Sequence, residues 1–399
     1  VRSASANQAP FVRLADRYAL PFTFFAYAIA ITAWIVSGDA VRFLEVIVVA
    51  TPCPLLLAAP IAVISGMARA SRYGIIVKTG SALERLAEAR TIAFDKTGTL
   101  TSGILTVDDV RAFGSHTKDE VLALAASLEQ SSNHILAQAI VTEAKQQKLK
   151  LKKLKNVKEI AGRGLQAQLK GDEIVIGRLS LLENHGVTLP AKFKPESIRE
   201  TATYLAVNGE LAGVITLSDE IRPETEATME NLRLLGLRNF MMVTGDNRTT
   251  ALAIASKLGI NEVYSDMLPA DKLRVLDESK QRPVAFIGDG VNDAPVLAAA
   301  DVGIALGARG STAASESADM VIMLDDLSRV ATGVEIAKRT FGIARQSILV
   351  GIGLSLILML VFSTGKFSAL SGAIIQEVVD VIVIFNALRA HLINPSNVQ

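Results

Sequence analysis

The residues best suited to chemistry stand together in one short stretch of the chain. This stretch is the heptad Asp95-Lys96-Thr97-Gly98-Thr99-Leu100-Thr101, directly after the apolar run 91–94. A short apolar run of this kind predicts a buried strand. A carboxylate at the end of such a strand can attack a phosphate, while Lys96 and the amides of the glycine turn neutralise the oxygens it approaches. An isolated Asp-Lys pair would be an ordinary surface turn, but these seven residues after a strand indicate a nucleophile.

Two further apolar runs end in acidic, glycine-rich loops. Residues 240–243 lead into Thr244-Gly245-Asp246-Asn247, and residues 284–287 lead into Gly288-Asp289-Gly290-Val291-Asn292-Asp293. The region 75–329 alternates such runs with helical patterns, which predicts α/β layers. Because ligands bind at the carboxyl edge of an open parallel sheet, we expect these loops to meet the heptad there.

The heptad resembles the phosphorylation signature of the P-type ATPases, ion pumps that form an aspartyl-phosphate. The set of loops resembles the haloacid-dehalogenase-like phosphotransferase fold, whose order of Asp, Thr, Lys and an acidic pair is the order here. The resemblance implies that the catalytic residues are Asp95, Lys96, Thr97, Thr244, Gly245, Asp246, Lys272, Asn292 and Asp293. Asp95 would attack the γ-phosphate of ATP, and Lys272 and Thr244 would stabilise charge on the transferring oxygens. On its own, Lys272 would be an ordinary surface lysine.

The same resemblance implies a Mg²⁺ ion, which needs hard oxygen ligands in near-octahedral geometry. Its ligands would be the Asp95 carboxylate, the Thr97 backbone carbonyl and Asp289. Asp293 would orient Asp289, and Asn292 would touch the phosphate.

The stretch 104–216 interrupts this fold and resembles the nucleotide-binding insertion of heavy-metal P-type ATPases. In that family a Glu, a His-Pro pair and a Gly-x-Gly mark the adenine pocket, and the matches here are Glu129, His134, Gly162 and Gly164. The proline is missing, because Ile135 follows His134. Two plainer interpretations stay open: His134 as an ordinary residue at a helix start, and the Gly-x-Gly as a hairpin turn.

Four segments have the length and apolarity of membrane spans: 19–38, 46–68, 346–365 and 367–388. They form two hairpins with short connections at 39–45 and at Lys366. Basic residues cluster on the opposite side of both hairpins, which places both termini and the intervening region in the cytoplasm. The resemblance implies a multi-pass membrane protein. In a bacterium, this membrane would be the plasma membrane.

A metal site inside the membrane is indicated by Thr51-Pro52-Cys53-Pro54 in the second span. Each proline removes a backbone donor, at a cost of about 3 kcal/mol or more in an ordinary helix. In lipid, the freed carbonyls survive only if they face protein, water or an ion. The only cysteine of the chain at this break predicts a soft-metal ligand, as against a kinked packing helix with an inert thiol. Heavy-metal pumps carry Thr-Pro-Cys, among other variants, at this point.

Glu377 and Asp380 on the last span are expected to complete this site with Cys53. They stand three residues apart, which predicts a shared helix face, and Gln376, four residues before Asp380, is expected to lie near that face too. A carboxylate at bilayer depth costs about 2.5–3.5 kcal/mol on insertion scales, which indicates a function. Thiolate with carboxylate favours a divalent ion such as zinc, cadmium or cobalt over Cu⁺. The alternative is that these carboxylates pair with a span outside the chain.

The composition excludes several classes of protein. Half of the 399 residues are hydrophobic and only 20% are charged, and the net charge of +1 gives no sign of a nucleic-acid partner. One cysteine excludes an intrachain disulfide framework. The expected partners are a transition-metal ion and the lipid bilayer. Nothing in the chain matches the Thr-Gly-Glu motif of the family's actuator, so we also expect a missing actuator segment.

We therefore predict a multidomain protein with α-helical membrane spans and an α/β haloacid-dehalogenase-like phosphorylation domain carrying an inserted α+β nucleotide-binding domain. The predicted boundaries are a membrane hairpin with the metal site at 1–80, phosphorylation-domain segments at 81–103 and 217–335, the nucleotide-binding domain at 104–216 and a membrane hairpin at 336–399.

The resulting hypothesis is ATP-driven export of a divalent transition-metal ion through an aspartyl-phosphate, with ATP and Mg²⁺ as cofactors. The main alternative is a membrane-anchored phosphatase that transports nothing. Phosphatases of this superfamily usually carry a second Asp two residues after the nucleophile, and Thr97 stands at that position. A regulatory subunit without catalysis is disfavoured by Asp95, Lys272, Asp289 and Asp293, and a potassium pump by Cys53.

Overall fold

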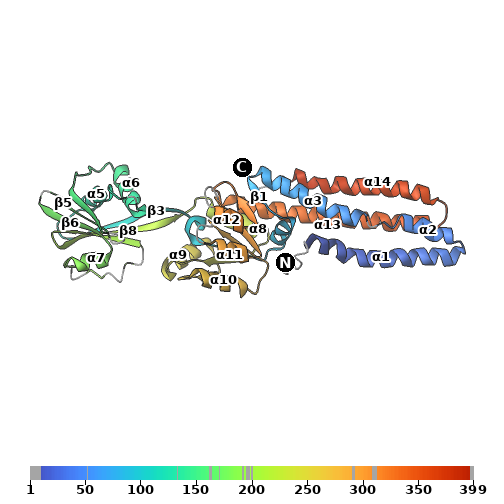
Figure 1. The fold of residues 1–399 in the computed structure, drawn as a ribbon, viewed down its shortest axis with the longest axis horizontal. Coiled ribbons are helices and arrows are strands. Elements are labelled where there is room, and N and C mark those ends of the chain that lie inside the picture. The colour runs from blue at the N-terminus through green and yellow to red at the C-terminus, as the bar shows by residue number, and fades with distance from the viewer. Residues whose placement is uncertain are drawn as a thin grey trace. The chain divides into compact units, whose positions relative to one another are not determined.

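The structure is a computed structural model. It describes residues 10–51, 53–132, 134–160, 164–169, 171–190, 193–194, 198, 201–289, 293–307 and 312–395. The chain forms two compact units (Figure 1). Unit 1 comprises Val1–Asp95, Glu224–Val243 and Ile260–Gln399, and unit 2 comprises Lys96–Pro223 and Thr244–Gly259.

Unit 1 contains a seven-stranded sheet in the order β1-β13-β12-β11-β2-β9-β10. All neighbouring strands are parallel except β1, which pairs antiparallel with β13. The strands are β1 Ile75–Val77, β2 Thr91–Phe94, β9 Asn239–Val243, β10 Glu262–Tyr264, β11 Val284–Gly288, β12 Val302–Leu306 and β13 Met320–Ile322. Every residue of β2, β11 and β12 is buried, as expected for parallel strands covered on both faces. The predicted α/β layers are confirmed.

Short helices of unit 1 accompany this sheet, and three of them contribute to the buried apolar cluster around Phe286. They are α4 Gly80–Glu88, α8 Thr225–Leu234, α10 Pro269–Asp277, α11 Ala294–Ala299 and α12 Thr312–Ser317. Val275 of α10 and Leu297 of α11 belong to one buried cluster with Phe286 of β11. This packing fixes α10 and the start of α11, which carry Lys272 and Asp293, against the sheet.

The long apolar helices of unit 1 are α1 Pro10–Ser37, α3 Cys53–Arg72, α13 Ser328–Phe362 and α14 Ala369–Leu388. The short α2 Ala40–Val48 precedes α3, and a turn of 3-10 helix, η3 Arg389–Leu392, follows α14. Within the described residues, three helices are long and apolar enough to cross a membrane: Tyr18–Ser37, Ser328–Phe362 and Ala369–Leu392. The first, third and fourth predicted spans lie in these helices.

The second predicted span, 46–68, is interrupted near its prolines, as their positions in the sequence predict. The helix α2 ends at Val48, residues 49–51 are not helical, and α3 begins at Cys53. The cause is the pair of prolines, which cannot donate to the helix ladder and disfavour helix in the residue before them. Pro52 itself lies outside the described residues.

Helices also extend beyond the predicted spans. The predicted connection 39–45 is mostly helical, because the Asp39 side chain accepts the Val41 amide at 2.9 Å and starts α2. The third predicted span, 346–365, overlaps the second half of α13, which starts at Ser328 and runs for 35 residues.

Unit 2 contains a six-stranded antiparallel sheet in the order β3-β8-β7-β6-β5-β4. The strands are β3 Thr101–Ala112, β4 Lys155–Ile160, β5 Gly164–Leu169, β6 Asp172–Gly177, β7 Thr201–Val207 and β8 Glu210–Ile221. Helices α5 Lys118–Glu129 and α6 Ile135–Gln146 share a buried apolar core with this sheet. The remaining elements are the turn η1 Lys96–Leu100, α7 Leu179–Asn184 and α9 Arg248–Leu258. The predicted boundaries at 104 and 216 fall inside β3 and β8.

Candidate functional site

Asp95 lies at the carboxyl end of β2, the strand that pairs in parallel with β11 on one side and β9 on the other. Its backbone amide donates to the carbonyl of Ile287 at 2.9 Å, which continues the β2–β11 ladder through this residue. Only 7% of the residue is exposed. The sheet therefore fixes the backbone that carries this carboxylate.

Lys272 and Asp293 surround Asp95 in the first part of the site. The Lys272 ammonium donates to Asp95 Oδ1 at 2.7 Å and to Asp293 Oδ1 at 2.8 Å. Lys272 comes from the first turn of α10, and Asp293 comes directly before α11. Asp289 follows the end of β11 and is half-buried. The sequence prediction that these loops meet is thus confirmed for unit 1, while Asn292 lies outside the described residues.

The charges of this cluster perturb one another. The pKa of Asp95 is raised to about 7, chiefly by burial and next by the charge of Asp293. The positive charge of Lys272 lowers this pKa but does not outweigh the two other effects. Burial lowers the pKa of Lys272, but Asp95 and Asp293 outweigh burial and leave that pKa raised. Lys272 is therefore a cation at neutral pH, whereas Asp95 is only partly ionised there.

The donor set of this cluster suits a hard cation. Asp95, Asp289 and Asp293 supply carboxylate oxygens, and the positive charge of Lys272 opposes the charge of Asp95. No group of three or more His, Cys, Asp or Glu side chains placed to share a metal ion occurs in the described part of the chain. Mg²⁺ needs no such cage, because it binds through one or two carboxylates together with water and phosphate oxygens.

Unit 2 brings Lys96, Thr97 and Asp246 together. Lys96 Nζ lies 2.5 Å from Asp246 Oδ2, and the Thr97 hydroxyl donates to the same oxygen at 3.2 Å. The Asp246 amide donates to the hydroxyl of Thr244, which is itself buried, at 3.1 Å. These predicted residues, with Gly245 between Thr244 and Asp246, thus form one hydrogen-bonded group. Lys96, Thr97 and Asp246 also line a cavity of about 230 Å³.

Two residues that the sequence did not assign to the site hold the turn of the heptad. Gly98 has φ +72°, a conformation that favours glycine. The guanidinium of Arg222 donates to the Gly98 carbonyl at 2.8 Å and to the Thr101 carbonyl at 3.1 Å. Asp219 accepts from the Thr101 hydroxyl. The signal was available, because both residues stand in Asp219-Glu220-Ile221-Arg222-Pro223, where the chain returns from the insertion.

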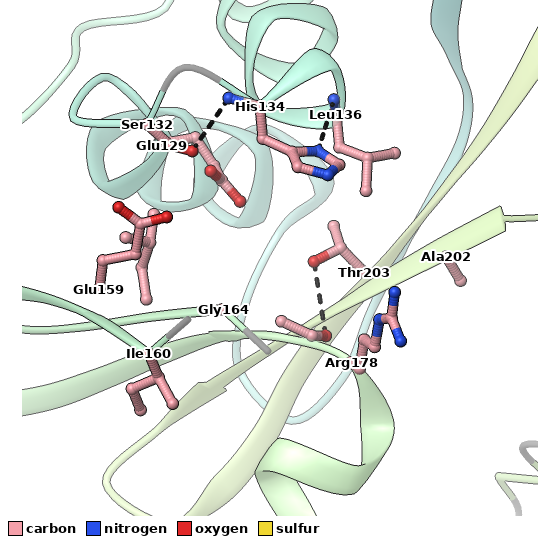
Figure 2. A pocket seen from close by; sticks show the side chains of 12 residues that line it. Glu129, Ser132, His134, Leu136, Glu159, Ile160, Gly164, Arg178, Ala202 and Thr203 are labelled. Carbon is pink, nitrogen blue, oxygen red and sulfur yellow. Dashed lines mark hydrogen bonds between the residues drawn. The ribbon is translucent and has the colours of Figure 1, made fainter. Parts of the chain in front are cut away.

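A second pocket of unit 2, about 150 Å³ in volume, is lined by Glu129, His134 and Gly164 (Figure 2). Three of the four residues predicted for nucleotide binding therefore share one cavity, and Gly162 lies outside the described residues. At Gly164, a Cβ atom would lie 2.0 Å from the carbonyl oxygen of Ile176, so only glycine fits.

His134 also fulfils its plainer interpretation as a helix-start residue. It is the N-cap of α6, and its Nδ1 accepts the Leu136 amide at 3.3 Å. The capping bond fixes the ring at the wall of the pocket (Figure 2). Glu159, Arg178 and Thr203 line the same pocket but were not identified from the sequence. They lie on β4, before α7 and on β7, and only the fold brings such distant residues together.

The two membrane carboxylates of α14 differ in burial. The face of α14 that is buried within the chain carries Gln376 and Asp380, and the Gln376 amide donates to Asp380 at 3.3 Å. Glu377, three residues before Asp380, is exposed. Gln376, four residues before Asp380, is offset from it by about 40° around the helix, and Glu377, three residues before it, by about 60°. Gln376 therefore lies nearer to the direction of Asp380. Cys53, at the start of α3, is half-buried, and α3 packs against α14.

Comparisons with known proteins point to one family. The model of the haloacid dehalogenase-like hydrolases matches residues 89–301. Copper-transporting ATPase 2 of Rhizobium meliloti is 35% identical over 99% of this chain and 50% of its own length. The zinc-exporting P-type ATPase of Mycobacterium marinum is 33% identical over 98% of this chain and 54% of its own length. The chain thus spans about half the length of these curated relatives.

A solved structure agrees with these relatives. The crystal structure of a zinc-transporting PIB-type ATPase in the E2.Pi state superposes with a TM-score of 0.81 at 31% identity. The superposition covers 94% of this chain and 63% of that one. The likeness therefore extends over both the apolar helices and the sheets of unit 1 and unit 2.

Proposed function

Because the chain belongs to the haloacid dehalogenase-like hydrolases and, within them, to the heavy-metal P-type ATPases, we propose that it transfers the γ-phosphoryl group of ATP to Asp95. This step would be coupled to the passage of a divalent transition-metal ion across a membrane. The single observation that carries the proposal is the position of the Lys272 ammonium, which donates both to Asp95 at the end of β2 and to Asp293 before α11.

Asp95 is the nucleophile in this proposal. A carboxylate oxygen forms a bond to the γ-phosphorus, the bond to the bridging oxygen breaks, and ADP leaves with that electron pair. Lys272 neutralises charge on the attacking carboxylate and on the phosphoryl oxygens. Lys96 and the turn amides around Gly98 neutralise further oxygens of the phosphoryl group. Thr244 and Asp246 position this turn through their hydrogen bonds.

Mg²⁺ would be held by Asp95 and Asp289, with Asp293 orienting the second carboxylate. When bound, it supplies positive charge that offsets the charge of the phosphate oxygens. The same charge would lower the raised pKa of Asp95 and keep this carboxylate ionised near neutral pH. The Thr97 carbonyl as a third ligand and Asn292 as a phosphate contact remain predictions from the sequence.

The nucleotide base would occupy the pocket of Glu129, His134 and Gly164. The bare backbone of Gly164 at the wall admits a flat ring, and Glu129 and His134 supply polar groups for its edge. Gly162 is expected to continue this wall.

The transported ion would bind at the break between α2 and α3, where Cys53 begins α3. Asp380 is the stronger carboxylate candidate, because it is buried on the face of α14 that Gln376 shares. Glu377 stays a predicted ligand only if a segment outside the described residues covers it. One thiolate with hard oxygen ligands favours zinc, cadmium or cobalt.

Incubation of the protein with γ-labelled ATP and Mg²⁺ tests the phosphoryl transfer. We expect an acid-stable, hydroxylamine-sensitive adduct that is lost in Asp95→Asn and kept in the matched control Asp277→Asn, an exposed residue at the end of α10. An adduct that persists in Asp95→Asn would contradict the proposal.

A metal screen of the same reaction tests the transport assignment. Zinc, cadmium or cobalt should change the phosphorylation level in the parent protein but not in Cys53→Ala. If none of these ions changes it, the transport assignment fails while the phosphotransferase assignment stands.

A further inference from the structure

The nucleotide pocket of unit 2 contains a second carboxylate that no sequence motif marks. Glu129 ends α5 and is 9% exposed, whereas Glu159 lies on β4 and is exposed at its side chain. Both line the same cavity, and Figure 2 shows both carboxylates on the side of the pocket away from Arg178. A negative charge on Glu159 at the wall of this small cavity disfavours a second negative charge on Glu129.

The surroundings of Glu129 disfavour its charged form. In the described part of the chain, its side chain makes no hydrogen bond and no ion pair. Its pKa is raised to about 7, first by burial and then by the charge of Glu159. The other titratable or charged residues that line the pocket are His134, whose Nδ1 already accepts the Leu136 amide, and Arg178, which is exposed. Near neutral pH, a large share of Glu129 is therefore the uncharged acid.

The protonation state of this carboxyl group decides which base it can pair with. An uncharged carboxyl offers one donor and one acceptor side by side, whereas a carboxylate only accepts. The edge of adenine presents an acceptor, N1, beside a donor, the N6 amino group. The edge of guanine presents two adjacent donors, N1–H and the N2 amino group. The acid therefore matches adenine, and the carboxylate matches guanine.

We propose that Glu159 is a positioning residue for base selection: its charge at the pocket wall holds Glu129 in the acid form, which pairs with adenine and rejects guanine. This inference rests on the proposed function, because only a nucleotide site has a base to select. It adds a residue that acts through Glu129 without requiring contact between Glu159 and the nucleotide.

The test compares ATP and GTP affinities of the full chain between pH 5.5 and 8.5, by displacement of a fluorescent ATP analogue. The ratio of the two affinities is the readout, because ionisation of the triphosphate affects both nucleotides alike and cancels. In the parent protein, the preference for ATP should fall by up to about tenfold per pH unit above the pKa of Glu129. In Glu159→Gln the midpoint should move to lower pH, and the preference at pH 7 should fall several-fold.

Two further variants make the result decisive. Glu129→Gln keeps one donor and one acceptor at every pH, so its preference for ATP should not depend on pH. Glu183→Gln, on α7 and outside the pocket lining, should keep the parent profile. If the pH midpoint of the ATP preference in Glu159→Gln equals that of the parent protein, the proposal is overturned. A parent profile in Glu129→Gln would also overturn it and would assign the titration to another group, such as His134.

Failure of the proposed function is distinguishable from failure of this inference. Loss of labelled phosphate at Asp95 in saturating ATP would contradict the proposed function. The pH dependence of the ATP-to-GTP ratio is measured by binding alone, so it still decides the role of Glu159.

Discussion

Lys272 Nζ lies 2.7 Å from Asp95 Oδ1, and both residues are only 7% exposed. The two residues are far apart in the sequence, and they meet because β2 and α10 belong to one α/β layer. The contact places a permanent cation on the carboxylate that we assign as the nucleophile. It also keeps that carboxylate in place before any nucleotide binds, which reduces the reorganisation that phosphoryl transfer requires.

Removing the Lys272 ammonium should impair phosphorylation more than it impairs ATP binding. In Lys272→Ala, the charges of Asp95 and Asp293 face each other without a cation, and the pKa of Asp95 should rise further. We expect the phosphorylation rate to fall by about 10²-fold or more, the size of effect seen when a transition-state donor is removed. Rapid-quench measurement of the labelled adduct checks this. Lys280→Ala, at an exposed lysine in the same unit, is the control and should keep the parent rate.

The raised pKa of Asp95 predicts a pH-dependent stability. A carboxyl whose folded pKa lies near 7 but whose unfolded pKa is 3.8 binds its proton more tightly when folded. Its contribution to stability is therefore full below the unfolded pKa and is lost as pH rises through about 7. Without Mg²⁺, Asp95→Asn should raise the unfolding temperature at pH 8 and have little effect at pH 4.5. Thermal unfolding followed by circular dichroism measures both, and an equal effect at the two pH values would contradict the assignment.

The phosphorylation motifs were predictable from the sequence, because each one joins a local strand signal to residues with defined chemistry. The heptad after 91–94 and the Gly-Asp loop after 284–287 both follow buried parallel strands, as expected. Glu159 was not predictable in the same way. It reaches the nucleotide pocket through the pairing of the sheet of unit 2, and a single sequence does not reveal which strand lies beside which.

The membrane helices show where local pattern was insufficient. Hydropathy identified the apolar segments, and the two prolines indicated the break within 46–68, but neither gave the bounds of the flanking helices. The carboxylates of α14 were assigned to one face from spacing alone. The buried stripe follows packing against neighbouring helices, which selects Gln376 and Asp380 and leaves Glu377 exposed.

Arg222 should stabilise the turn that carries Lys96 and Thr97. Its guanidinium satisfies the carbonyls of Gly98 and Thr101 on both sides of the turn. In Arg222→Ala these carbonyls lose their partner, at a cost of about 1–3 kcal/mol for a buried group. Arg111→Ala removes a surface arginine whose ion pair with Asp109 is solvent-exposed, so it should cost less than about 1 kcal/mol. Denaturant unfolding compares the two, and equal losses would refute the role of Arg222.

Gly66 should control the approach of α3 to α13. A Cβ atom at this position would lie 2.3 Å from Thr340 Oγ1 and 3.0 Å from Thr340 Cβ, so the two helices would have to separate. Thr340 cannot easily turn away, because a β-branched side chain in a helix has few rotamers. Gly66→Ala should therefore destabilise the chain by about 1–3 kcal/mol, as other overpacked contacts do. Gly353→Ala on α13 is the matched control, since a Cβ there has no atom within 4 Å. Thr340→Ala should restore part of the stability of Gly66→Ala in the double variant. If unfolding in detergent shows equal losses for the two glycine variants, or no rescue, this close approach does not govern the packing of α3 against α13.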